Sequence, residues 1–186
     1  MRGTGTSSDH RNLLLCPMAS RPKEIPKAWE APGDTFSAWS FIFTEELTDE
    51  IRPGPCIGSY GINVLLSYTG SARASAWELG TDVKAVKGMG QIPFCLDCVT
   101  YEAYLGPPLP YEDCPPAAPG GNWVCINRHE GGIKCLFADW SVRKVGLKEL
   151  HTLKWYEGDN AANPWTKQGG VKPEDWPEWM RHFKDY

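Results

Sequence analysis

A histidine and an aspartate separated by nine residues are the first pair in this sequence whose types suit joint chemistry. His129 and Asp139 can form a hydrogen-bonded pair, and with Glu130 or Asp97 they offer the ligands of a metal site. A hydrolytic triad would also need a nucleophile elbow, and the sequence has no G-x-S-x-G. We therefore expect structural roles: Asp139 caps turn N–H groups at a hairpin tip, and the His129 ring bonds a backbone carbonyl. No residue is assigned as catalytic, and we do not expect an enzyme.

Cysteines form the second reactive set. Cys95 and Cys98 have the C-x-x-C spacing of a redox dithiol or of half a zinc site. They lie in a strand-like run, where residues three apart point to opposite faces, and no second pair completes a zinc site. We therefore expect structural disulfides or buried thiols, with metal binding and redox chemistry as alternatives. A high cysteine count is typical of an oxidising compartment, with one to three disulfides and at least one free thiol. The seven candidates are Cys16, Cys56, Cys95, Cys98, Cys114, Cys125 and Cys135, with Cys16–Cys56 as one pair that could fix a loop.

Oxygen ligands and indole rings make up the remaining candidates. Asp159, Asn160 and Asn163 supply hard oxygen atoms in one loop, but their spacing is not that of an EF-hand. Solvated turn residues are the default interpretation of this loop, and calcium is the alternative. The nine tryptophans could also describe a secreted carbohydrate-binding module that stacks sugars on exposed rings. The rings left for that role are Trp29, Trp77 and Trp165.

The stretch from residue 127 to residue 155 has to position the His129–Asp139 pair. Gly131 and Gly132 mark its start, and apolar residues then alternate with others at the period of a strand with one buried face. A returning strand and a short helix follow, so we expect a β-hairpin-plus-helix unit. Trp140 follows Asp139 where glycine would favour a type I′ turn, so the turn here should be of another type or longer. The apolar positions that carry this prediction are Ile133, Cys135, Phe137, Val142, Val145, Leu147, Leu150 and Leu153.

The rest of the chain predicts short elements joined by long loops. We expect residues 1–10 to be a flexible end and residues 11–186 to form a single domain. Within it, 11–16 should be the last turn of a truncated N-terminal helix, with a stub of strand as the alternative. Sixteen prolines and nine tryptophans indicate loop-rich regions rather than a helical bundle. At 171–186, Pro173 followed by acidic residues opens a C-terminal helix that docks its apolar stripe on the domain. That stripe consists of Trp176, Trp179, Met180 and Phe183.

Composition narrows the class of protein. Nineteen Lys and Arg against twenty-three Asp and Glu give a net charge of −4, which argues against nucleic acid as a partner. No run of about 18 apolar residues is present, so no transmembrane segment is expected. The first ten residues also lack the apolar region of a secretory signal. The fold class that fits is α+β, with a small antiparallel sheet, long Pro- and Trp-rich loops and a docked C-terminal helix.

The segment from His129 to Asp139 resembles the H-X9-DG signature of prepilin-type proteins. These are pseudopilin-like proteins of the type II secretion and type IV pilin superfamily, of the kind abundant in planctomycete-type bacteria. The resemblance extends in order over most of the chain, through LLLCPMAS (13–20), GSYGIN (58–63), IPFCLDC (92–98) and the tail at 167–186. Two features depart from the family: Trp140 replaces the expected glycine, and the N-terminal hydrophobic helix is absent.

This resemblance implies a pilin-like head domain without its N-terminal helix. Such a protein would be a non-catalytic structural subunit of a type II secretion or type IV pilus-like assembly. Its partners would be homologous subunits in a filament, with exported substrates as further candidates, and only the missing helix would contact the membrane. Its place would be the cell envelope, on the periplasmic or extracellular face. Calcium in a loop like that at 159–163 is known among major pseudopilins, and no other cofactor is implied.

Overall fold

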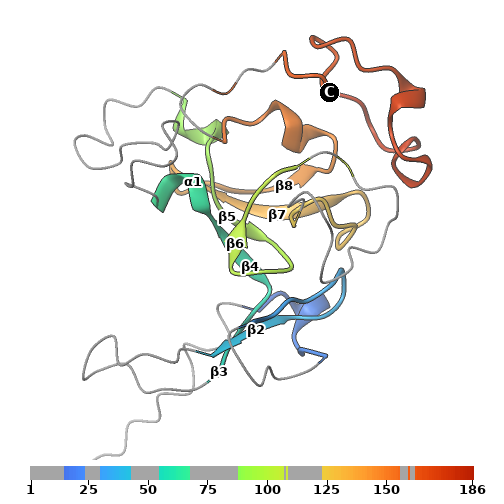
Figure 1. Ribbon diagram of the computed structural model, residues 1–186. Coiled ribbons are helices and arrows are strands. Elements are labelled where there is room, and N and C mark those ends of the chain that lie inside the picture. The colour runs from blue at the N-terminus through green and yellow to red at the C-terminus, as the bar shows by residue number, and fades with distance from the viewer. Residues whose placement is uncertain are drawn as a thin grey trace, which may run out of the picture.

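A computed structural model gives an α+β fold with two sheets and few helices (Figure 1). Residues 1–10, Trp29, Trp77, Cys114 and Asn160, on which some of the expectations above depend, lie outside its described part. The described residues are 15–23, 30–42, 55–67, 88–106, 108, 123–155, 159 and 162–186.

The larger sheet has five strands in the order β6-β4-β5-β7-β8. Neighbouring strands in this sheet are antiparallel except for β4 and β6, which are parallel. The sheet is therefore mixed, and the prediction of an antiparallel sheet is only partly right. The five-residue strand β5 lies at the centre, and its start at Pro93 is followed by a register shift against β7. The strands are β4 (Tyr60–Asn63), β5 (Pro93–Asp97), β6 (Glu102–Ala103), β7 (Gly132–Phe137) and β8 (Val142–Gly146).

The hairpin β7–β8 confirms the alternation read from the sequence. Ile133, Cys135 and Phe137 point into the core and are almost completely buried, while Lys134 between them is exposed. The expected helix after the hairpin is one 3-10 turn, Glu149–Thr152, rather than an α-helix. Its first residue also closes the turn after β8, because the Glu149 carboxylate accepts the Gly146 N–H at 3.1 Å.

The turn between the two strands is not type I′, as the residue after Asp139 suggested. The Trp140 N–H donates to the Phe137 carbonyl at 2.9 Å, and Trp140 itself has a φ of 66°. Ala138 and Asp139 have negative φ, so the loop is a type I turn followed by a left-handed residue, the arrangement of a three-residue hairpin loop. Glycine is favoured at that last position, and here a tryptophan takes it.

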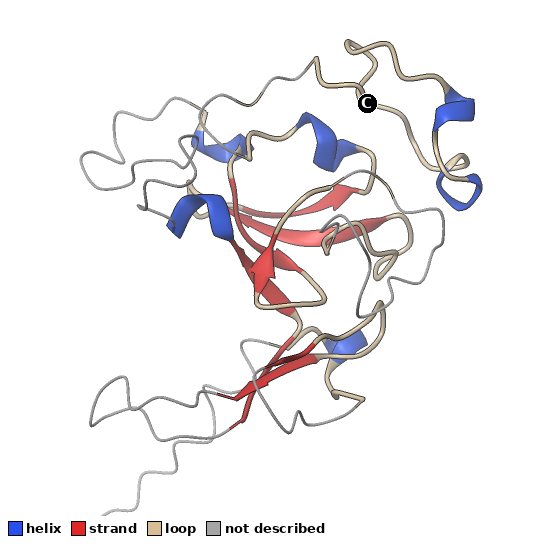
Figure 2. Cartoon of the chain, viewed as in Figure 1, coloured by secondary structure: helices blue, strands red, loops and turns tan. Residues whose placement is uncertain are grey.

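A smaller sheet packs at one end of the molecule, away from the C-terminal segment (Figures 1 and 2). It consists of β1 (Glu30–Ala31), β2 (Trp39–Ile42) and β3 (Pro55–Gly58), paired antiparallel in that order. Cys16 next to it has an extended backbone and precedes a 3-10 turn, Pro17–Ala19. The end of a helix expected over 11–16 is therefore wrong at Cys16, and residues 11–14 lie outside the described part.

The C-terminal segment docks as expected but does not form a helix. It contains two 3-10 turns, Pro173–Asp175 and Glu178–Met180, separated by an extended Trp176 with ψ 144°. The cause is Pro177, because the residue before a proline is pushed out of the helical region. The predicted 171–186 helix is thus wrong in type, whereas its apolar anchors Trp176 and Met180 are buried.

The main hydrophobic core joins the large sheet to the C-terminal segment. It combines the inner face of the large sheet with residues of the loop before β7 and with the two C-terminal anchors. The only α-helix in the described part is α1 (Val64–Ser67), a single turn after β4. Within the described residues, no helix has the length and the apolar character that crossing a bilayer requires.

Candidate functional site

The structure separates the two residues that the sequence pairs. His129 lies before the first residue of β7, while Asp139 lies beyond its last, at the exposed tip of the hairpin. There the Asp139 carboxylate accepts the Ser141 N–H at 2.9 Å and the Ser141 hydroxyl at 2.6 Å. These bonds lower the pKa of Asp139. The expected capping role of Asp139 is confirmed, and the direct His129–Asp139 pair is not formed.

His129 instead meets two residues from other parts of the chain. Its ring atom Nε2 lies 3.1 Å from Asp97 Oδ2 and 3.3 Å from Cys16 Sγ. Asp97 is completely buried, Cys16 is 1% exposed, and the side chain of His129 remains 19% exposed. The expected bond from the His129 ring to a backbone carbonyl is therefore replaced by contacts with a carboxylate and a thiol. We call these three residues the Cys16–Asp97–His129 cluster.

Arg128 holds the carboxylate of the cluster from the other side. Its Nη1 donates to Asp97 Oδ1 at 3.0 Å, and both side chains are fully buried. Three further guanidinium N–H groups donate to backbone carbonyls, so the charge is paired and most of its donors are used, as a buried ion pair requires. The carbonyls that accept from Arg128 are those of Thr35 (2.8 Å), Ser59 (2.8 Å) and Asp34 (3.0 Å).

Local structure explains how each member reaches the cluster. Asp97 is the last residue of β5, and its Oδ2 also accepts the Lys134 N–H from β7 at 2.7 Å. His129 is fixed by its own N–H, which donates to the Gly132 carbonyl at 3.1 Å across a tight turn. In that turn Gly131 has a φ of 77°, which suits glycine. Cys16 is held by its backbone N–H, which donates to the Ser59 hydroxyl.

The cluster is not arranged as a cysteine-nucleophile triad. In such a triad the imidazole accepts the nucleophile's proton on one ring nitrogen and binds the carboxylate through the other. Here Cys16 and Asp97 approach the same nitrogen of His129. Burial raises the pKa of the Cys16 thiol, and the nearby Asp97 charge raises it further, so the thiol stays protonated at neutral pH. The geometry therefore does not make Cys16 a ready nucleophile.

The donor set does suit a metal ion. One ligand atom from each of Cys16, Asp97 and His129 lies within 4.8 Å of the other two. A thiolate, an imidazole and a carboxylate are the ligands that zinc takes in proteins. Sequence reasoning had named Asp97 as a partner for His129 but had not placed Cys16 with them. Arg128 was missed altogether, because its partners lie far away in the sequence and no local pattern marks them.

The disulfides expected from the sequence are not formed among the described cysteines. No disulfide joins any two of Cys16, Cys56, Cys95, Cys98, Cys125 and Cys135, so the Cys16–Cys56 bridge is wrong. Burial raises the pKa of Cys95 to about 11 and that of Cys98 to about 12. A redox dithiol needs the opposite shift, so the C-x-x-C pair has the character of two structural thiols, of which Cys98 is buried and Cys95 is partly buried.

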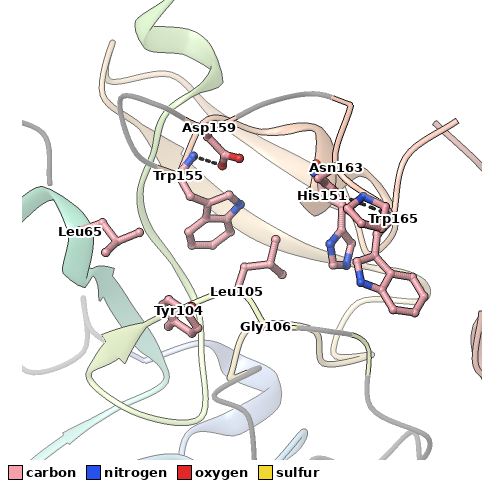
Figure 3. Close-up of a pocket in the computed structure, with 10 residues that line it drawn as sticks. Leu65, Tyr104, Leu105, Gly106, His151, Trp155, Asp159, Asn163 and Trp165 are labelled. Carbon is pink, nitrogen blue, oxygen red and sulfur yellow. Dashed lines mark hydrogen bonds between the residues drawn. The ribbon is translucent and has the colours of Figure 1, made fainter. Parts of the chain in front are cut away.

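A second feature is an open cavity of about 230 Å³ above the large sheet. Figure 3 shows Tyr104 and Leu105 facing Trp155 across it, with His151 beside Trp165 at the other end. The side chains of the expected calcium loop that are described serve turns here. Asp159 accepts the Trp155 N–H at 2.9 Å, and Asn163 accepts the Trp165 N–H at 2.9 Å. Calcium binding at this loop stays a prediction.

Comparison with family models, with curated proteins and with solved structures finds no match to this chain.

Proposed function

We propose that this chain is the globular head of a non-catalytic, pseudopilin-like structural subunit of an envelope filament. The proposal depends on the resemblance to prepilin-type proteins over five segments of the chain, from residue 13 to residue 186. Its partners would be further subunits of the same class, joined through the hydrophobic N-terminal helix that this class carries. The periplasmic or extracellular face of the envelope is the proposed location.

The observation that carries the proposal is the structural role of the H-X9-D motif in the β7–β8 hairpin. Asp139 caps the tip of the β7–β8 hairpin, and His129 ties the open end of the same hairpin to Asp97 in β5. Asp139 thus stiffens the tip of the hairpin, and His129 fastens its open end to the neighbouring strand. Residues that serve rigidity in this way suit a building block, which must present a constant surface to its neighbours.

The hairpin tip also offers a surface for such neighbours. Trp140 is 74% exposed and Val142 is 68% exposed, and the Trp140 ring lies 5.8 Å from the Phe94 ring. A large apolar ring held at the tip of a rigid hairpin is a feature of surfaces that make protein contacts. We therefore place a subunit contact at this tip.

Site-specific photo-crosslinking tests the proposal. The complete reading frame would be expressed in its native cell with a photo-reactive amino acid at Val142, and a matched variant would carry it at Lys172, an exposed position on the C-terminal segment. We expect position 142 to crosslink in the envelope fraction to another copy or to another pilin-type subunit, with little product from position 172. Recovery of the protein outside the envelope, with no crosslink from either position, would contradict the proposal.

A second candidate function is favoured by the aromatic cavity. Tyr104, Trp155 and Trp165 line a space large enough for about one sugar ring, and Asn163 supplies a polar edge. The candidate is a carbohydrate-binding module. Retardation in gels that contain soluble polysaccharide would support it if Trp165→Ala abolishes the retardation and Trp140→Ala, at the distant hairpin tip, preserves it. Unretarded migration of the unmodified chain over a panel of polysaccharides would remove it.

A further inference from the structure

We propose that Cys16, Asp97 and His129 bind one divalent transition-metal ion, and that zinc is the ion best matched to them. The ion would act as a clamp that fastens the N-terminal segment to the large sheet. This inference does not depend on the assembly role proposed above, because it follows from the geometry of the three side chains alone.

Distances between the ligand atoms are the first argument. In a tetrahedral site with zinc–nitrogen and zinc–oxygen bonds of about 2.0–2.1 Å and a zinc–sulfur bond of about 2.3 Å, ligand atoms lie roughly 3.3–3.6 Å apart. Nε2 of His129 is 3.3 Å from Cys16 Sγ and 3.1 Å from Asp97 Oδ2. An expansion of a few tenths of an ångström would bring these two pairs to the spacing of a metal site, and the third pair, Cys16 and Asp97, lies within 4.8 Å. The three side chains are therefore close to a preformed site.

The surroundings of the carboxylate are the second argument. Metal-binding carboxylates are usually held by hydrogen bonds from an outer shell. Arg128 occupies Asp97 Oδ1 and leaves Oδ2 facing His129, and the Lys134 N–H orients Oδ2 without filling it. The thiolate and the carboxylate together carry two negative charges, which balance those of a divalent ion and leave the Arg128 charge over.

Access and the fourth position are the third argument. The His129 side chain is 19% exposed while Cys16 and Asp97 are buried, so an ion can enter past the imidazole edge. Three protein ligands leave one position, which solvent can take. On binding, the Cys16 S–H loses its proton to solvent and a sulfur–metal bond forms.

The position of the ligands in the chain tells what the ion would do. Cys16 precedes the first described 3-10 turn, Asp97 ends the central strand, and His129 precedes the hairpin. A metal bond would replace the weak thiol–imidazole contact that now joins the N-terminal segment to this site. Metal binding that joins distant segments contributes directly to folding stability. The clamp would thus hold the segment through which the chain enters the sheet.

Cobalt substitution gives a direct test on the full chain. The chelator-treated protein would be titrated with Co²⁺, which reports a bound thiolate through a sulfur-to-cobalt charge-transfer absorption, and then with Zn²⁺ in competition. We expect one equivalent of Co²⁺ to produce this absorption and Zn²⁺ to displace it. Unmodified protein that saturates with neither ion, or that binds Co²⁺ without the thiolate absorption, would overturn the proposal.

Substitutions assign the ligands. Cys16→Ser and His129→Gln should each weaken Zn²⁺ binding by about 100-fold or more, whereas Cys56→Ser, which alters a thiol outside the cluster, should leave it unchanged. Zinc should raise the midpoint of thermal unfolding of the unmodified chain and of Cys56→Ser, and a chelator should reverse the rise. Should a cluster variant fail to fold, the cobalt spectrum of the unmodified chain and of the other variant still decides the question. Equal binding by Cys16→Ser and the unmodified chain would refute the assignment.

Discussion

His151 allows a quantitative prediction about stability and pH. The ring lies within an aromatic group, 6.1 Å from the Trp165 ring and 5.6 Å from the Trp176 ring, and its Nε2 has no hydrogen-bond partner. Burial lowers the pKa of His151 from 6.5 to about 4. The folded chain therefore resists protonation at a site that the unfolded chain protonates readily.

The sign and size of the effect follow from this difference. Above pH 6.5 the histidine is neutral in both states and costs nothing; as the pH falls toward 4, only the unfolded state gains the proton, so stability is lost. Each tenfold difference in proton affinity is worth about 1.4 kcal/mol, so the fall from pH 7 to pH 4 costs about 3 kcal/mol from this group. Most of that loss should occur between pH 6.5 and pH 4.

The variant His151→Phe should remove this loss of stability at low pH, since a phenyl ring suits the aromatic surroundings and does not titrate. We would measure the free energy of unfolding in urea by tryptophan fluorescence at pH 7, 6, 5 and 4. The unmodified chain should lose about 3 kcal/mol more than the variant over this range. His182→Gln, at an exposed position, serves as the control and should follow the unmodified chain. Curves for His151→Phe and the unmodified chain that run parallel would refute the reasoning.

Three further predictions concern backbone and charge. Trp140 has a φ of 66°, so Trp140→Gly should be more stable than Trp140→Ala by about 1 kcal/mol in thermal or urea unfolding. A Cβ on Gly61 would lie 2.7 Å from the Thr100 carbonyl oxygen, so Gly61→Ala should cost about 1–3 kcal/mol in urea unfolding, more than Ile62→Ala on the exposed side of the same strand. Arg128→Met leaves Asp97 buried without its ionic partner and should cost about 3–5 kcal/mol, part of which Asp97→Asn restores in a double-mutant cycle.

Each of these has a result that would contradict it. For the turn, a Trp140→Ala variant as stable as Trp140→Gly would mean that the left-handed conformation is not maintained. For the strand, a harmless Gly61→Ala would show that β4 and the 98–100 segment are less closely packed than the structure has them. For the buried pair, purely additive effects of the Arg128 and Asp97 substitutions would show that the two charges do not interact.

Patterns over short distances were sufficient for part of this fold. The alternation from Ile133 to Phe137 predicts β7, and the spacing of Trp176 and Met180 marks the residues that the C-terminal segment buries. The capping role of Asp139 also followed from its place at the tip. Such features depend on the repeat with which side chains along a strand or turn face the same side, and on residues a few positions apart. The helix expected at the C-terminus is wrong because Pro177 pushes Trp176 out of the helical region, despite the apolar spacing. This proline is visible in the sequence itself.

The sequence by itself determined the hairpin and the identity of its motif residues. Only the tertiary structure decided which of them meet: His129 joins Asp97 and Cys16 rather than Asp139. It also decided that Arg128 is buried, with partners drawn from segments around residues 35, 59 and 97. The physical reason is that these contacts join residues far apart in the chain. They form only once the sheet has brought the ends of its strands together, and no local period encodes them.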